Sequence, residues 1–262
     1  MSTGFPQSAI EGVPLDMPVN LALQTTLTIS QFIIAAVVTV IVAMLSSKET
    51  RGVNLFLLVG ASGCFLLEAF ADNLLMIWHP TPGQWSIFHA YGHYVPVWVM
   101  PTLYWAFGGQ AVWALAWMRR GVPRATLWKL YCFFVFTDLL FELPPLWQDV
   151  YVYYGDQPLA WPPVLALPMY FPFGNAIVTV AAAAAALLAE RFIDARKQPW
   201  LIAPIVLTAI FCGTAIYAWP VSLTLYSDAP AWVSQASGLL SVAISLLFMR
   251  IVVNAFGKDQ PA

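Results

Sequence analysis

The chain has 262 residues, of which 60% are hydrophobic and 9% are charged, and its mean hydropathy is +0.74. Soluble domains carry about 25% charged residues, so this composition excludes an ordinary soluble protein and indicates an integral membrane protein. There are 11 Lys and Arg against 13 Asp and Glu, and this balance excludes nucleic acid as a partner, because no basic surface is available to neutralise phosphates.

Seven apolar stretches are long enough to cross a bilayer, which needs about 20 residues per helix. No Lys or Arg occurs in the first 24 residues, unlike in a secretory signal, so we expect the first stretch to be retained. The sequence therefore predicts one all-α domain, residues 1–262, that forms a polytopic membrane protein with a seven-transmembrane helical bundle. The expected spans cover residues 21–46, 53–78, 89–117, 125–147, 163–189, 200–220 and 231–254.

All eleven basic residues fall on one side of this seven-span bundle. The loops on the other side, 79–88, 148–162 and 221–230, contain neither Lys nor Arg and are rich in Pro, Trp and Tyr. The positive-inside rule then predicts that the N-terminus is outside and the C-terminus cytoplasmic, in the cell membrane or the endoplasmic reticulum. The outer loops can form a lid over a cavity or anchor the protein at the interface. The basic residues are Lys48, Arg51, Arg119, Arg120, Arg124, Lys129, Arg191, Arg196, Lys197, Arg250 and Lys258.

Four acidic residues lie inside the expected spans without Lys or Arg at the same depth. Glu68 and Asp72 are four residues apart on span two, and Asp138 and Glu142 repeat this spacing on span four, so each pair shares one helical face. We expect the four side chains to converge on one cavity. A buried charge costs several kcal/mol in a membrane, and desolvation and like-charge repulsion favour the protonated acid. The cluster can therefore hold a proton and deliver it to a substrate, although protonated acids can also serve only as hydrogen bonds between helices.

A third pair with this spacing, His89 and His93, is expected to open span three, with His79 in the loop before it. Together with Asp72 and Glu142, these histidines offer ligands suited to Zn, Mn or Fe. A metal-dependent membrane hydrolase or oxidase is therefore an alternative. The histidines should begin nearer the interface than the acids, which favours an interfacial or substrate-orienting role.

Asn175 is expected at mid-span, after Pro168 and Pro172, which free backbone carbonyls that must find partners or line a cavity. Its amide can position a carboxyl group or a substrate hydroxyl, or hydrogen-bond between helices. Aromatic residues make up 15% of the chain, and their faces stabilise cations. With Asn175, the expected substrate-binding residues are His93, Tyr94, Trp98, Trp105, Tyr170 and Trp219.

Three short motifs carry a resemblance to known families. They are Phe65-Leu66-Leu67-Glu68, Thr137-Asp138-Leu139-Leu140-Phe141-Glu142, and Pro168-Met169-Tyr170-Phe171 followed by Asn175. In them the chain resembles the emopamil-binding-protein-like sterol isomerases and the small seven-span integral membrane terpene cyclases. The isomerases carry a histidine where this chain has Cys64, and the cyclases carry an acid in the final span, where this chain has only Asp228 just before it.

The resemblance implies acid-initiated carbocation chemistry on an isoprenoid or sterol-like lipid, with no redox cofactor. Glu68 or Asp138 would donate the proton, while Asp72 and Glu142 would adjust its acidity or reclaim the proton. An epoxide would accept the proton more readily than an alkene, and aromatic walls would keep water away from the cation. A non-enzymatic lipid or cation binder or transporter is a further alternative.

Overall fold

The computed structural model describes residues 13–160 and 167–259, and most of them are helical. Within this part of the chain, six helices are long and apolar enough to cross a membrane, which agrees with the predicted multi-pass helical fold. They are α1 (Leu21–Leu45), the continuous α2–η2–α3 (Arg51–Ser62, Gly63–Leu67 and Glu68–Leu75), α6 (Arg124–Trp147), α7 (Tyr170–Ala189), η4–α8 (Pro199–Leu201 and Ile202–Leu225) and α9 (Ala231–Phe256).

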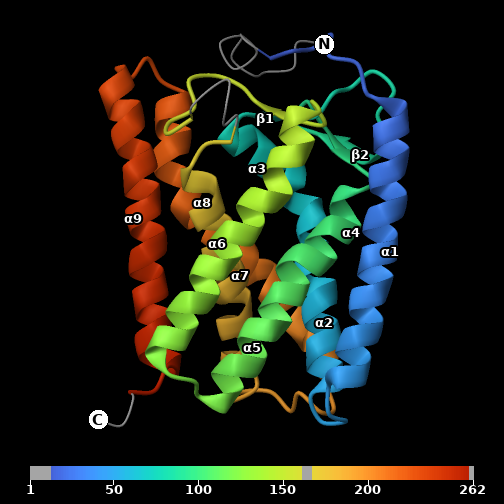
Figure 1. The fold of residues 1–262 in the computed structure, drawn as a ribbon, viewed down its shortest axis with the longest axis vertical. Helices are drawn as coiled ribbons and strands as arrows, with labels where there is room; N and C mark the ends of the chain where they lie inside the picture. The colour runs from blue at the N-terminus through green and yellow to red at the C-terminus, as the bar shows by residue number, and fades with distance from the viewer. Residues whose placement is uncertain (1–12, 161–166, 260–262) are drawn as a thin grey trace.

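Residues 99–120 form one more helical segment, which lies beside these helices in Figure 1. Its parts are α4 (Val99–Leu103), the π-helical turn η3 (Tyr104–Gly109) and α5 (Gln110–Arg120). The predicted span three, 89–117, is wrong at its start, because residues 86–96 form an antiparallel hairpin of β2 (Ser86–Ala90) and β3 (His93–Pro96). Tyr91 and Gly92 both have positive φ at the turn, which reverses the chain where a helix was expected.

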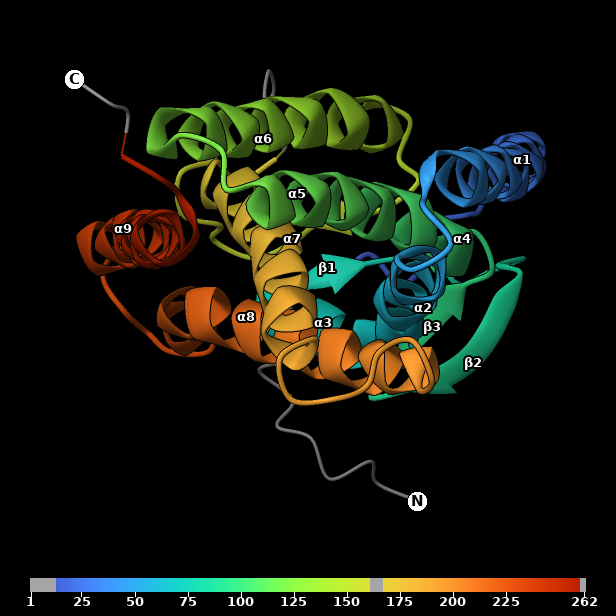
Figure 2. The same ribbon diagram turned by 90° about the horizontal axis from the view of Figure 1, so that it is seen from below.

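Helix α7 occupies the centre of the bundle, with α5, α6, α8 and α9 around it (Figure 2). In the most apolar 18-residue stretch of α7, 72% is buried within the protein, whereas 22% is buried in the corresponding stretches of α1 and α6. The run of alanines from residue 181 to 186 contributes to this burial, because small side chains let neighbouring helices approach closely. The centre of the bundle is thus tightly packed in this half of α7.

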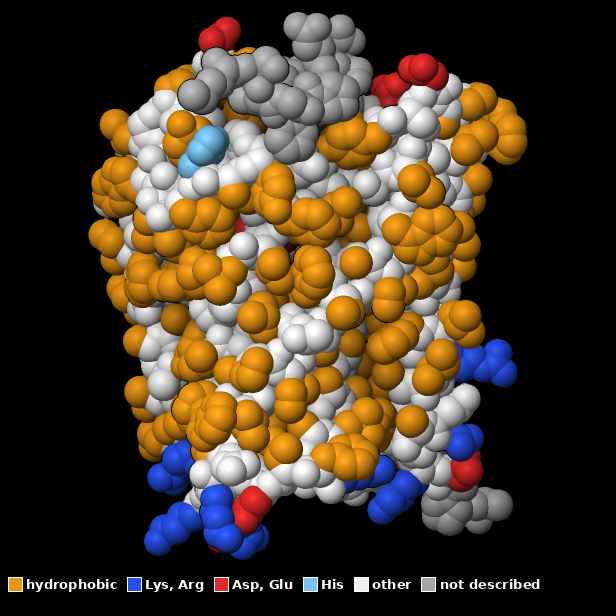
Figure 3. Space-filling model, turned by 180° about the vertical axis from the view of Figure 1, so that it is seen from behind, with side chains coloured by type: hydrophobic (Ala, Val, Ile, Leu, Met, Phe, Trp, Pro, Cys, Tyr) orange, Lys and Arg blue, Asp and Glu red, His pale blue; other side chains and the backbone are white. Residues whose placement is uncertain are grey.

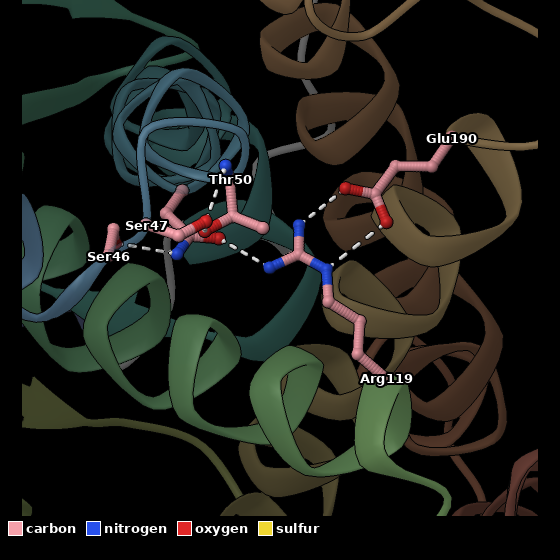
Figure 4. Close-up of polar contacts among 6 residues, drawn as sticks. Ser46, Ser47, Thr50, Arg119 and Glu190 are labelled. Carbon is pink, nitrogen blue, oxygen red and sulfur yellow. Dashed lines mark hydrogen bonds and ion pairs between the residues drawn. The ribbon is translucent and has the colours of Figure 1, made fainter.

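The two ends of the bundle differ in charge. Figure 3 shows Lys and Arg gathered toward one end, where some Asp and Glu accompany them, Asp and Glu without Lys or Arg at the other end of this face, and an apolar surface between the two ends. We call the first the basic end and the second, where α1 begins, the N-terminal end. At the basic end, Arg119 of α5 forms a bidentate ion pair with Glu190, which follows α7 (Figure 4). Arg119 also donates to Asn54 of α2 at 3.0 Å, and Asn54 donates to Ser46 at 2.8 Å.

At the N-terminal end, the loop after α6 folds back over the end of α3. Met76 adopts a left-handed conformation that ends α3 at Leu75, three residues before the predicted end of span two. Strand β1 (Ile77–Trp78) then pairs with β4 (Val152–Tyr153) of that loop. Residues 161–163 of the predicted lid and the predicted start of span five lie outside the described residues.

Candidate functional site

Two neighbouring cavities lie toward the N-terminal end of the bundle, and Asn175 borders both. The carboxyl cavity consists of two adjoining pockets of about 120 and 90 Å³, both lined by Glu68, Asp72 and Glu142. The aromatic cavity, of about 280 Å³, is lined by Asp138 and by the rings of Trp105, Phe107, Phe134 and Phe141. The structure thus brings three of the four predicted acids to one cavity and places the fourth in the next.

In the carboxyl cavity, the acids come from two helices. Glu68 begins α3 directly after the 3₁₀ turn η2, and Asp72 follows one turn later, while Glu142 comes from α6. Neither Lys nor Arg lines the cavity in the part of the chain that the structure describes. Three carboxyl groups without a cationic partner cannot all be ionised at this depth without a large cost, so at least part of the cluster holds protons.

His79 closes this cavity toward the N-terminal end. Its Nδ1 lies 3.2 Å from Asp72 Oδ2, and both side chains are almost fully buried. The two atoms are not aligned as a hydrogen bond, and neither has another hydrogen-bond partner among the described residues. The imidazole packs against Trp98 and Tyr151 at ring-centre distances of 5.7 and 5.6 Å. The sequence places His79 only in a loop, and its contact with Asp72 depends on the turn at Met76.

Tyr151 is a second residue of the site that the sequence did not indicate. Its hydroxyl donates a hydrogen bond to Glu142 Oε2. Burial and the adjacent Glu142 carboxyl raise the pKa of Tyr151 well above its ordinary value, so the phenol keeps its proton and remains a donor. The pairing of β1 with β4 brings this loop residue over the cavity, and no pattern within the loop itself predicts that pairing.

Asp138 faces the aromatic cavity instead of the carboxyl cavity. Asn175 Nδ2 donates to its Oδ1 at 3.0 Å, whereas its Oδ2 is buried and has no partner among the described residues. The prediction of a single cavity for all four acids is therefore wrong for Asp138. One helical turn from Glu142 places Asp138 about 6 Å farther along α6, toward the basic end, and there the side chain meets Asn175.

Asn175 is held by its neighbours on α7 and α8. It lies in the second turn of α7, not at mid-span, because α7 begins at Tyr170 and Pro172 occupies the first turn, where its missing N–H costs no hydrogen bond. The hydroxyl of Tyr217 donates to Asn175 Oδ1 at 3.4 Å, which turns the amide nitrogen toward Asp138. Gly174 makes room for this arrangement, because a Cβ there would lie 2.3 Å from the Tyr217 ring.

The other predicted substrate-binding residues are divided between the cavities and the surface. Trp98 lines the carboxyl cavity, and Trp105 lines the aromatic cavity. The rings of Trp105 and Phe141 meet edge to face, with 5.1 Å between their centres. Tyr170 is fully buried but lines neither cavity. Tyr94 and Trp219 are 37% and 49% exposed, so the structure corrects their expected place in the cavity wall. The hairpin and the outer face of α8 turn these two rings outward.

The histidine pair does not form the predicted helical face. His89 is exposed on the hairpin and stacks on Tyr94, whereas His93 is buried against Trp78. Burial lowers the pKa of His93, which keeps its imidazole neutral at pH 7. Among the described residues, no group of three or more His, Cys, Asp or Glu side chains is placed to hold a metal ion. The alternative ligand set of His89, His93, Asp72 and Glu142 is therefore not assembled.

The fold and the site define a multi-pass helical membrane protein with buried, uncompensated carboxyl groups. Comparison of the chain with protein-family models, curated proteins and solved structures finds no significant match.

Proposed function

We propose that this protein is an integral membrane cyclase or isomerase that protonates an isoprenoid or sterol-like lipid and guides the resulting carbocation. One observation carries the proposal: Asp138 lines a cavity walled by aromatic rings, with one oxygen held by Asn175 and the other buried without a hydrogen-bond partner among the described residues. This is the arrangement of a neutral carboxylic acid prepared to give up a proton. The carboxyl cavity beside it supplies further acids that can adjust or restore this proton.

The hydrogen bond from Asn175 favours the transfer. When Asp138 loses its proton, Oδ1 becomes part of a carboxylate, and a hydrogen bond to a charged acceptor is about twice as strong as one between neutral groups. Asn175 therefore stabilises the transition state more than the ground state, which is the condition for catalysis. The aromatic faces support the positive charge on the substrate and exclude water that would quench it.

The cavity size supports an apolar substrate taken from the bilayer. A volume of about 280 Å³ lies just below the usual range for ligand pockets, about 300–1,000 Å³. It suits a small isoprenoid or the reacting head of a longer lipid. The proton given at the start returns to the protein at the end, so the reaction is a net isomerisation and transfers no electrons. No redox cofactor is needed.

We also propose that the chain crosses the membrane seven times. The basic end then lies on the cytoplasmic side, in either the cell membrane or the endoplasmic reticulum. Residues 99–120 rise about 33 Å at 1.5 Å per residue, enough to cross the apolar core. The position of Lys and Arg supports the orientation. A cysteine introduced at position 122 should react with an impermeant reagent only after permeabilisation, and one at position 155 without it. The reverse pattern would invert the topology.

The catalytic proposal is tested by Asp138→Asn in membranes supplied with candidate isoprenoids, epoxidised and not. The carboxamide keeps the shape of the side chain but has no transferable acid proton, so product formation should fall by a factor of about 10² to 10⁴. Asp228→Asn, at an exposed acid between α8 and α9, is the matched control and should leave turnover unchanged. Near wild-type turnover of Asp138→Asn would refute the donor assignment. Loss of activity in His89→Ala, with Asp138→Asn active, would support the metal-dependent alternative instead.

A further inference from the structure

A line of buried polar groups connects the loop at the N-terminal end with the carboxyl cavity. His79 is its outermost member and lies 3.2 Å from Asp72. Asp72 lines the cavity together with Glu68 and Glu142. His79 Nδ1 and Asp72 Oδ2 are both buried and face each other, and neither has another hydrogen-bond partner among the described residues, so each is the other's polar neighbour.

We propose that His79 is a proton relay between water at the N-terminal end and the carboxyl cavity. Its use in catalysis rests on the proposed function, but the proton exchange itself does not. His79 touches no reacting atom in this mechanism and acts through Asp72, so it is a positioning and relay residue of the acid cluster. The relay transfers protons and no other group.

The transfer balances in two steps. The neutral imidazole, protonated at Nδ1, takes a proton at Nε2 from a hydronium ion, which becomes water, and is then an imidazolium beside the Asp72 carboxylate. Once a small rotation of the ring aligns Nδ1–H with Asp72 Oδ2, 3.2 Å away, the ring gives this proton to Asp72 and is left neutral with its proton on Nε2. A flip of the neutral ring brings the protonated nitrogen back to the Asp72 side and restores the starting tautomer. The sum is one solvent proton moved to Asp72, with no bond between heavy atoms formed or broken, and the reverse sequence returns a proton to water.

Among the described groups around the carboxyl cavity, His79 is the one suited to carry a proton. Facing it are Asp72 from α3, Glu142 from α6, Tyr151 from the loop before β4, and His93 from β3. Tyr151 keeps its proton, because its pKa is raised by burial and by Glu142. His93 is neutral and packs against Trp78. An imidazole can accept a proton at one ring nitrogen while it donates from the other, which suits His79 to pass a proton on.

Beyond Asp72, water can carry the proton to the other acids. The two pockets of the carboxyl cavity have volumes of about 120 and 90 Å³. One water molecule needs roughly 10–15 Å³, so each pocket has room for water. Carboxyl oxygens on both walls supply the polar partners that hold such water in place. Glu142 then lies one helical turn from Asp138, so the relay ends beside the proposed proton donor.

The relay is tested by infrared spectroscopy of the full-length protein in lipid nanodiscs, transferred into deuterated water. The C=O bands of protonated carboxyl groups are assigned by their loss in Glu68→Gln and Asp72→Asn, and their shift on deuteration is followed in time. In His79→Gln the exchange should be slower by a factor of about 10². The matched control is His89→Gln, at the exposed histidine of the same end, which should exchange at the wild-type rate.

A second variant separates relay from structure. In His79→Ala, added imidazole should restore fast exchange, which a merely structural role would not allow. Wild-type exchange in His79→Gln, failure of imidazole to restore exchange in folded His79→Ala, or absence of protonated carboxyl bands from the wild type would each overturn the relay. If exchange depends on His79 but no isoprenoid is converted by the wild type, the relay stands and the proposed function fails.

Discussion

The Arg119 cluster at the basic end and the acids toward the N-terminal end treat buried charge in opposite ways. At the basic end, the guanidinium of Arg119 is matched by the Glu190 carboxylate and the Asn54 amide, and Asn54 is in turn bonded to Ser46. Toward the N-terminal end, Asp72, Asp138 and His79 each keep a buried atom without a hydrogen-bond partner among the described residues. A satisfied network joins helices, whereas unsatisfied groups around a cavity remain available for chemistry. The difference separates a structural cluster from a candidate site.

The largest stability effect is expected at the basic end. Arg119→Ala removes the cation that joins α5 to the end of α7 and to α2, and leaves Glu190 without its partner. Breaking a buried ion pair costs about 3–5 kcal/mol, and because these side chains are 18% and 22% exposed, we expect about 3 kcal/mol. Unfolding in detergent micelles measures the loss. Arg120→Ala, at the exposed neighbouring residue, is the control and should destabilise the protein less. Equal destabilisation by the two substitutions would contradict the structural role of Arg119.

A smaller loss is expected where α7 meets α8. Gly174→Ala places a Cβ 2.3 Å from the Tyr217 ring, and overpacking of this kind costs about 1–3 kcal/mol. The shift of Tyr217 should also release Asn175 from its orientation toward Asp138 and lower turnover. Gly63→Ala is the matched control, because its Cβ would meet only Leu207 at 3.8 Å. If both variants have the same melting temperature and turnover, the close packing at Gly174 does not position the site.

The smallest stability effect is expected in the carboxyl cavity itself. Glu68→Gln replaces an acid that has no Lys or Arg beside it among the described residues with a neutral side chain of the same shape, so the free energy of unfolding should stay within about 0.5 kcal/mol of wild type or increase. Glu190→Gln, the same chemical change at the basic end, should destabilise the protein. Equal destabilisation by the two substitutions would show that the acids of the cavity are as structural as the Arg119 cluster.

Much of the helical framework follows from the sequence because hydrophobic length is a local property. The predicted span 21–46 corresponds to Leu21–Leu45, and the predicted span 231–254 to Ala231–Phe256. The spacing of Glu68 and Asp72 also predicts their common face, since the helical period sets it. The hairpin at residues 86–96 was missed because the spacing of His89 and His93 suits a helix, while the turn at Tyr91 and Gly92 reverses the chain between them.

The sequence by itself determined the class of protein, most of its helical segments and the presence of acids that a membrane does not tolerate without a reason. Only the tertiary structure decided which groups these acids meet. Helix rotation turned Trp219 toward the surface, and the depth of Asp138 along α6 placed it beside Asn175 in a separate cavity. The pairing of β1 with β4 brought Tyr151 to Glu142. These contacts join segments far apart in the chain, and their geometry depends on how whole helices pack, which no local pattern of residues specifies.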